Sequence, residues 1–498
     1  MSEAPSAALV GEMSEPPRAA LVVRNTATHD ARVLRCARTL QSLGYDAIVI
    51  AITSEEEGAE RDVAQGIPIV RLTPRAPLAG TARALRRVVS RRANGATATA
   101  GGGRVVPDVP QLRDRYGYAN CGTSPSGRRL SPLARLYRLL RTLSYYRRGI
   151  AAVRALRPAV VHCNDYNTMW IGVGAKLLTG CALIYDSHEL WPDRNGRTEP
   201  RWWLLACEAL FLRLADTTLA TSPGHADAIA RRHRVPPPQV VRNIAERPPQ
   251  VVRNVVERPP QVVRNFAERP PEIVRNVAER ANGSSVSPDT GSAGSGAIPP
   301  ASGSGRTLVY AGAVTGSRGL EQAIAALPHA RGMTLRVVGP GARAYREHLA
   351  DLAARHGVAD RVRLDRPVPP QQVVEEIAAA AAGAALIQPS CLSYALSLPN
   401  KLFEYLAAGL PILAADVPVI REFVERNGVG LVVPPDDPEA IAAAMLEIAE
   451  PERNRRLRAA VKKASGEFSW EQEAEHLKRA YREATATSTT VASPACGR

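Results

Sequence analysis

The stretch that says most about this chain is Pro389-Ser-Cys-Leu-Ser-Tyr-Ala-Leu-Ser-Leu-Pro-Asn-Lys-Leu-Phe-Glu-Tyr-Leu-Ala-Ala-Gly-Leu-Pro411. Its pattern predicts a strand end, a loop and a helix that begins at Asn400 and carries Glu404 in its first turn. An apolar strand over Pro411–Ala415 follows. The backbone N–H groups of a helix start and the Lys401 ammonium suit phosphate, and the Glu404 carboxylate suits ribose hydroxyls. The stretch therefore predicts a sugar-nucleotide site on an α/β scaffold.

Apolar strands and amphipathic helices alternate on both sides of this stretch. A strand over Ala19–Val23, a helix over Asp30–Leu43 and a strand over Ala47–Ile52 form a first β-α-β unit, and a second α/β unit begins at Thr307–Ala311. A β-α-β order indicates a parallel sheet, and ligands bind such sheets at the carboxyl ends of the strands. The predicted fold class is α/β, with two doubly wound, Rossmann-like domains that face a central cleft.

At 498 residues the chain is too long for one core and suits two domains with additional segments. The segment Pro237–Arg247 recurs with an 11-residue period through Arg280, and each copy offers only a four-residue strand-like piece after Pro-Pro. This favours a duplicated linker over a stacked solenoid. The predicted organisation is a disordered, duplicated start (1–18), an N-terminal domain (19–236) with a basic, low-complexity insertion at about 75–130, a hinge in four tandem copies (237–280), a flexible linker (281–305), a C-terminal domain (306–468), a final helix (469–485) and a polar tail (486–498).

The net charge of +16 comes almost wholly from arginine, because only five lysines occur. Nucleic acid, an anionic membrane surface or phosphate-bearing substrates could balance such a charge. Nucleic acid is not expected as a partner, because neither zinc-finger spacing nor an RNA-binding aromatic motif occurs. Seven scattered cysteines without a Cys-x-x-Cys pair, together with the lack of a signal-like start or a long apolar run, predict a reduced, cytoplasmic protein.

The segment Pro132–Val153 combines an apolar stripe with many arginines. Such a pattern is typical of a helix that lies on a membrane surface, here the inner face of the plasma membrane. It is also typical of a domain helix whose stripe faces the core and whose basic face is solvated, and we favour this second interpretation. Peripheral contact with an anionic membrane therefore stays open.

These motifs resemble a known family. From about residue 19 to 485, apart from the insertions, the chain resembles the GT-B-fold glycosyltransferases, in particular the retaining family 4 and its branch with Leu-Pro-Asn-Lys at this position. The segment Asn400–Gly409 is similar to the family's donor-binding helix, and Glu404 matches the second glutamate of its Glu-x7-Glu motif. The first glutamate would fall at Leu396, which departs from the pattern and puts a glutamate contact with the sugar in doubt.

The resemblance places the donor in the C-terminal domain. Val309–Leu320 is similar to the family's first strand and glycine loop, where Gly312 lets the backbone approach the phosphates and Arg318 matches a basic residue beside the diphosphate. Val337–Gly341 matches the next strand and its glycine turn. The donor-binding residues implied in this way are Gly312, Arg318, Gly339, Asn400, Lys401, Leu402 and Glu404.

The resemblance places the reacting centre in the N-terminal domain. Tyr185–Leu190 is similar to a motif whose histidine reaches the sugar and the acceptor, so His188 is the implied catalytic residue, with a structural histidine as the alternative. Asp30 contacts the acceptor or simply caps its helix. The residues expected on the acceptor side are Asp30, Arg32, Asn164 and Asp165.

Transfer in this family needs neither a metal nor another cofactor, because cationic groups and helix N-termini neutralise the diphosphate leaving group. We therefore expect a nucleotide-diphosphate sugar as donor and a glycan, a lipid-linked compound or a small metabolite as acceptor. A sugar-nucleotide epimerase and a non-catalytic subunit are the alternatives. The Val-Val-Arg-Asn of each repeat resembles the strand that crosses between the domains. We expect Val240–Asn243 of the first copy to occupy that crossing, and the last copy is the alternative.

Overall fold

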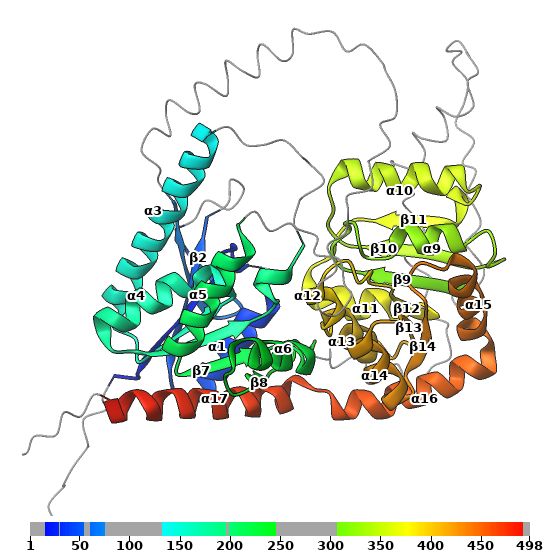
Figure 1. The fold of residues 1–498 in the computed structure, drawn as a ribbon. Helices are drawn as coiled ribbons and strands as arrows, with labels where there is room; N and C mark the ends of the chain where they lie inside the picture. The colour runs from blue at the N-terminus through cyan, green and yellow to red at the C-terminus, as the bar shows by residue number, and fades with distance from the viewer. Residues whose placement is uncertain are drawn as a thin grey trace, which may run out of the picture.

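Two parallel α/β domains make up the described part of the chain and lie beside each other (Figure 1). The computed structural model describes residues 15–28, 30–53, 60–74, 132–195, 199–245 and 306–491. Most of the predicted N-terminal tail, the basic insertion, the later hinge copies with the linker, and the end of the final tail lie outside these ranges. The two sheets are those of the predicted α/β class.

In the described ranges the N-terminal sheet has eight strands: β1 (Arg18–Val22), β2 (Asp46–Ile52), β3 (Arg61–Ala64), β4 (Ile67–Leu72), β5 (Val160–Asn164), β6 (Ala182–Ser187), β7 (Thr217–Ala220) and β8 (Gln239–Val240). Their order is β3-β4-β2-β1-β5-β6-β7-β8, and of these described strands only β3 runs antiparallel to its neighbour. The strand order reverses between β1 and β5, and ligands bind such sheets at this switch point.

Helices cover both faces of this sheet because its strands are apolar on both sides. They are α1 (Ala31–Ser42), α3 (Pro132–Leu156), α4 (Met169–Thr179), α5 (Arg201–Leu214) and α6 (Pro223–His233), with short 3-10 turns η1 (Tyr166–Thr168) and η2 (Trp191–Asp193). Ala19 and Leu21 pack with α1 on one face, whereas Ala20 and Val22 pack with α3, α4 and α5 on the other. This is the two-residue alternation of an extended strand.

The C-terminal sheet has six parallel strands: β9 (Thr307–Ala311), β10 (Thr334–Val338), β11 (Val362–Asp365), β12 (Ala382–Ala385), β13 (Ile412–Ala415) and β14 (Gly430–Val433). Their order is β11-β10-β9-β12-β13-β14, which reverses between β9 and β12. The helices that cover the two faces are α9 (Leu320–Ala326), α10 (Arg343–Arg355), α11 (Val373–Ile377), α12 (Leu392–Ala395), α13 (Asn400–Ala407), α14 (Pro418–Asn427), α15 (Pro438–Ala449) and α16 (Pro451–Glu467).

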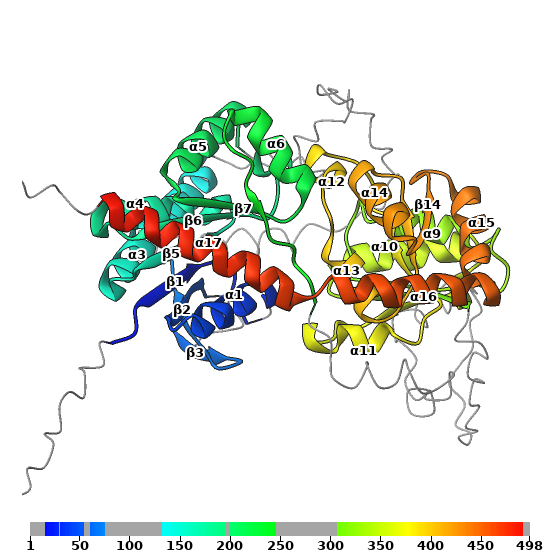
Figure 2. The same cartoon turned by 90° about the horizontal axis from the view of Figure 1, so that it is seen from below.

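The last helix, α17 (Trp470–Val491), returns from the C-terminal domain to the N-terminal one (Figure 2). Trp470, Leu477 and Tyr481 are buried in the same apolar cluster as α1 and the N-terminal strands. A helix that follows the C-terminal domain in sequence thus completes the core of the N-terminal domain.

The first copy of the 11-residue repeat crosses between the domains. β8 adds to the N-terminal sheet beside β7, and the amide of Val241 donates to the Ala220 carbonyl at 2.9 Å. Val241 is buried in the N-terminal core and Ile244 in a core of the C-terminal domain. The copies from residue 248 onward lie outside the described residues.

Among the helices in the described ranges, none combines the length and apolar character that crossing a bilayer requires. Helix α3 is neither a membrane-surface helix nor a core-facing domain helix along its whole length. Tyr145 and Val153 in its second half are buried, whereas Leu136, Leu139 and Leu143 in its first half are about half exposed.

Candidate active site at the domain boundary

Helix α13 is anchored to the carboxyl ends of two C-terminal strands at the switch point. The Tyr405 hydroxyl donates to the Ala384 carbonyl of β12 at 2.9 Å and accepts from the Ala311 amide of β9 at 3.2 Å. The side chain of Leu402 is fully buried in the core, and its amide donates to the Pro399 carbonyl, so this predicted donor residue packs the helix against the sheet. The anchoring sets the positions of the polar residues that precede and follow Leu402.

Lys401 and Arg318 lie close enough for their charges to act on each other, and we call them the cation pair. The Lys401 ammonium is buried and lies 3.8 Å from the centre of the Tyr310 ring, and the Arg318 guanidinium lies 4.8 Å from the Tyr394 ring. Burial, and secondly the charge of Arg318, hold the pKa of Lys401 well below its usual range. Within the described ranges neither cation forms an ion pair, and the buried Nε of Arg318 has no hydrogen-bond partner. An anion between them would relieve the repulsion of the two charges.

Two glycine turns bring backbone close to this cation pair. Gly312 follows β9 with φ of 131°, and Gly339 follows β10 with φ of 150°. A Cβ atom on Gly339 would lie 1.9 Å from the Gly312 carbonyl oxygen, which no side chain permits. Beside Gly312, the Lys401 Nζ is 4.0 Å from the position of a Cβ atom. The turns thus leave the approach to Lys401 open at the end of β9.

Glu404 faces the other domain. Burial raises the pKa of its carboxyl, and the charges of Lys401 and of Arg35 on α1 oppose that shift. Arg35 also donates to the Asn243 side chain in the crossing segment and stacks 5.0 Å from the Trp470 ring. Glu404 therefore lies where α1, the crossing segment and the start of α17 converge.

On the N-terminal side, His188 is held between two carboxylates. Its Nε2 is 3.1 Å from Oδ2 of Asp186, and its Nδ1 is 3.4 Å from Oδ2 of Asp165. Burial disfavours the charged imidazole, but the two carboxylates outweigh it and raise the pKa of His188 to about 10. His188 is thus an imidazolium at neutral pH, a hydrogen-bond donor rather than a base.

Asp165 adopts a backbone conformation that is nearly restricted to glycine, with φ of 67° and ψ of 159°. Such a conformation costs on the order of 1–3 kcal/mol and is found mainly at functional sites. The Asp165 amide donates to the Asp186 carbonyl at 2.9 Å, and its carboxylate accepts from the His188 amide at 3.3 Å. These bonds direct the carboxylate toward His188.

A buried network supports Asp186 from below. Arg32 donates to both carboxylate oxygens, at 2.8 and 2.9 Å, and to the Val241 carbonyl of the crossing segment at 2.9 Å. Arg32 and His188 hold the pKa of Asp186 well below its usual range, although burial acts in the opposite direction. Behind Asp186, His162 bonds to the Tyr481 hydroxyl of α17 at 2.7 Å. The network links the crossing segment and the last helix to His188.

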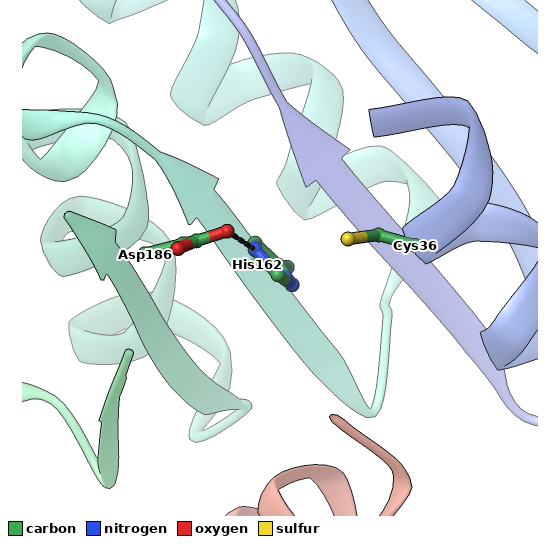
Figure 3. Close-up of side chains that lie close together, drawn as sticks. All are labelled: Cys36, His162 and Asp186. Atoms are coloured by element: carbon green, nitrogen blue, oxygen red, sulfur yellow. Dashed lines mark hydrogen bonds and ion pairs between the residues drawn. The ribbon is translucent and has the colours of Figure 1, made fainter. Parts of the chain in front are cut away.

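Cys36, His162 and Asp186 also have metal-ligand chemistry, and their donor atoms lie within 4.8 Å of one another (Figure 3). Arg32 already occupies both oxygens of Asp186, and Tyr481 occupies Nδ1 of His162. Burial raises the pKa of the Cys36 thiol to about 12, which disfavours the thiolate that a metal needs. The three residues therefore fit a packed hydrogen-bonded core better than a metal site.

The remaining predicted residues have more local roles. Asp30 caps α1, because its Oδ1 accepts from the Val33 amide at 3.2 Å. Asn164 is buried and donates to the Val22 carbonyl at 3.3 Å, and Asn400 is exposed at the start of α13. Arg32 lies beneath the site rather than on its surface.

Sequence reasoning missed Asp186, His162 and Tyr481 as members of the network. A charged residue and a histidine inside apolar strands were a usable signal for the first two. For Tyr481 the sequence offered none, because its partner lies in a distant strand.

The two sides of the site face each other across the domain boundary. The amide of Leu190 donates to the Ser393 hydroxyl at 3.2 Å, and the Ser222 hydroxyl donates to the Leu396 carbonyl at 2.7 Å. Glu189, next to His188, lies close enough to Arg318 for that charge to oppose the burial that raises the pKa of Glu189. Leu396 thus stands in a contact between the domains.

Two family models match the chain, one in each domain. Residues 96–243 match the glycosyl transferase 4-like domain, and residues 305–451 match glycosyl transferases group 1. A D-inositol 3-phosphate glycosyltransferase from Thermobispora bispora is 34% identical over 137 residues, or 27% of this chain and 31% of that protein. One from Streptomyces scabiei is 35% identical over 126 residues, or 25% and 27%. The chain therefore spans less than a third of the length of these curated relatives.

Solved structures extend the likeness of the fold to nearly the whole chain. Sucrose-phosphate synthase from Thermosynechococcus elongatus has a TM-score of 0.63 at 16% identity and covers 95% of this chain and 100% of its own. Anabaena Alr3699/HepE in complex with UDP and glucose has a TM-score of 0.56 at 11% identity and covers 94% and 99%. With one matching family model in each domain and this shared architecture, the chain belongs to the group 1, family 4-type glycosyl transferases and has the GT-B fold.

Proposed function

We propose that this protein transfers a sugar from a nucleotide-diphosphate donor to an acceptor hydroxyl. The observation that carries the proposal is the cation pair of Lys401 and Arg318, which is partly buried, forms no direct ion pair with a carboxylate among the described residues and lies beside the Gly312 turn. A diphosphate supplies the missing charge, and Glu404 at the same helix suits the ribose. The Anabaena neighbour, which was solved with UDP and glucose, supports a nucleotide donor of this kind.

The same cations support a reaction without a metal. Charge develops on the diphosphate as the glycosidic bond to the donor breaks, and fixed cations that face this charge lower the barrier. On the opposite side, both ring N–H groups of the His188 imidazolium face carboxylates, so this residue would contribute its positive charge and the position of Asp165 to the site rather than a direct hydrogen bond to the substrate. We propose retention of the anomeric configuration, in keeping with the family that the chain resembles. Peripheral contact with an anionic membrane is a separate proposal that depends on another surface.

Donor binding tests the proposal directly. Melting temperatures are measured with UDP-, GDP-, ADP- and dTDP-sugars, and the affinity of the sugar that raises the melting temperature is then determined by calorimetry. Lys401→Met keeps an unbranched side chain that is one atom shorter, and it removes a charge-assisted hydrogen bond worth about 1.5–3 kcal/mol, so we expect affinity to fall about 10- to 150-fold. The matched control is Lys462→Met, at an exposed lysine on α16.

The expected result is a donor-dependent rise in melting temperature that is smaller in Lys401→Met and unchanged in Lys462→Met. Sugar transfer should then persist in EDTA, because the cation pair replaces a metal. If no nucleotide sugar binds, or if Lys401→Met binds like the wild type, the proposed donor site is wrong.

A further inference from the structure

Exposed apolar side chains gather on one part of the N-terminal domain. Of the ten large hydrophobic side chains that are exposed in the described ranges, five lie on the first half of α3 and the start of α5. A folded domain normally buries such side chains, and an exposed group of them marks a contact with another molecule or a membrane. We call this group the α3/α5 surface. Its members are Leu136, Leu139, Leu143, Trp202 and Trp203, which are 48–69% exposed.

The two helices bring this surface to the same edge of the sheet as His188. The Thr142 hydroxyl on α3 accepts from Arg24, directly after β1, and the Tyr145 hydroxyl donates to the Val23 carbonyl. On α5, the Leu204 carbonyl accepts from the hydroxyl of Tyr166, directly after β5. Both attachments are at carboxyl ends of strands, and the first turns of α3 extend beyond the body of the domain (Figure 1).

The charged side chains of α3, which lie around the α3/α5 surface, are all positive. The helix carries six arginines and no acidic residue, and Arg135, Arg138, Arg141 and Arg147 are exposed. In the described part of the chain, none of these four forms an ion pair. Leucines and tryptophans interleaved with arginines suit an interface in which apolar side chains enter the acyl boundary and guanidinium groups meet anionic headgroups.

The chain's own insertion is a poor alternative occupant for this surface. Residues 75–131, which precede α3 in the sequence, contain eleven arginines and two aspartates. Their charge repels the arginines of α3 and favours the same kind of anionic surface.

We propose that the α3/α5 surface docks the N-terminal domain on an anionic lipid bilayer. Docking in this way places the sheet edge that carries His188 near the lipid headgroups. The proposal is independent of the donor site, which lies on the other domain.

Vesicle binding tests the proposal with the full-length protein. Sedimentation is compared between vesicles of pure phosphatidylcholine and vesicles with about 30% phosphatidylglycerol, at low and at high salt. We expect binding only to the anionic vesicles, and weaker binding at high salt. Replacing Leu136, Leu139 and Leu143 together by serine should weaken binding more than tenfold, as should Trp202→Ser combined with Trp203→Ser.

Arginine variants test the role of charge. Arg135→Gln, Arg138→Gln and Arg141→Gln should each weaken binding to the anionic vesicles about fivefold. This factor corresponds to the free energy of about 1 kcal/mol that one basic residue near an anionic surface contributes to binding. Leu177→Ser with Leu178→Ser, at exposed leucines on α4, is the matched control and should bind like the wild type. All variants replace exposed side chains and should keep the melting temperature and donor affinity of the wild type.

Three results would overturn the proposal. The first is a wild type that fails to sediment with anionic vesicles at low salt. The second is unchanged binding by the leucine and tryptophan variants. The third is a dimer in ultracentrifugation that these variants convert to monomer without any effect on lipid binding, because a second copy of the chain would then cover the surface.

Discussion

Acidification should loosen the contact between the two domains through His225. This histidine on α6 is 1% exposed, and its Nε2 lies 2.9 Å from the Ser393 carbonyl on α12 of the other domain. Burial against the C-terminal domain lowers its pKa to about 4. In the unfolded chain a histidine titrates near pH 6.5. As the pH falls, the native state therefore takes up this proton at a pH about 2.5 units lower than the unfolded state does.

The magnitude follows from these two values. At about pH 5 the unfolded state is largely protonated at His225 and the native state is not, so the unfolded state holds more protons and stability falls as the pH falls. Lowering the pH from about 7.5 to about 5 then costs about 2 kcal/mol through this residue alone. For domains of this size that corresponds to a fall of about 4–8 °C in melting temperature.

Comparison with His225→Gln isolates the contribution of this residue. Glutamine keeps an N–H group that can donate to the Ser393 carbonyl but does not titrate. Melting temperatures of both proteins are measured by calorimetry at the two pH values, and we expect the wild type to lose about 4–8 °C more than the variant. Equal losses in the two proteins would refute the reasoning, because His225 would then titrate in the same range when folded and unfolded.

Two further predictions concern the supports of the site. Gly339→Ala places a Cβ atom 1.9 Å from the Gly312 carbonyl oxygen, so we expect a loss of at least about 1–3 kcal/mol of stability and of donor affinity. Calorimetry measures the stability and donor titration the affinity. The control is Gly316→Ala, where a Cβ atom has nothing within 4 Å, and this variant should behave like the wild type. A Gly339→Ala protein with unchanged stability and affinity would contradict the close approach of the two turns. Tyr481→Phe leaves Nδ1 of the buried His162 without its partner, so we expect a cost of about 1–3 kcal/mol in chemical denaturation, and no change would show that α17 does not support this network.

Local hydrophobic patterns in the sequence were sufficient to predict the class of the fold. The apolar run Thr307–Ala311 is a strand at the expected residues, and the strand expected over Pro411–Ala415 spans Ile412–Ala415. Both were predictable because burial on both faces of a parallel sheet leaves a continuous apolar signature. The short edge strand β3 was not predicted, since its residues are mostly exposed and carry no such signature. The start of α13 at Asn400 was also predictable, because Pro399 ends the preceding extended segment.

The donor side of the site could be predicted in part for the same reason. Lys401 and Glu404 lie on one short helix, and the glycine turns lie directly after strands, so each signal is contained in a few consecutive residues. Leu402 was predicted together with the polar residues around it, and the structure places its side chain in the core. The sequence does not distinguish the two roles within a single helical turn.

The roles of the residues on the acceptor side could not be predicted from the sequence, because they depend on contacts between segments that are far apart in the chain. Arg32 meets Asp186 across 154 residues, and His162 meets Tyr481 across 319 residues. Whether a buried arginine or histidine is a support or a reacting group depends on which partners surround it, and that is a property of the packed structure.

The amino-acid sequence therefore established the two α/β domains and the phosphate-suited helix start, because helix and strand periodicity and helix capping act over a few residues. Folding alone decided that His188 is an imidazolium between two carboxylates, that Leu396 joins a domain contact, and that α17 completes the opposite domain. Burial, charge separation and hydrogen-bond partners set these properties, and all three arise only when distant segments pack together.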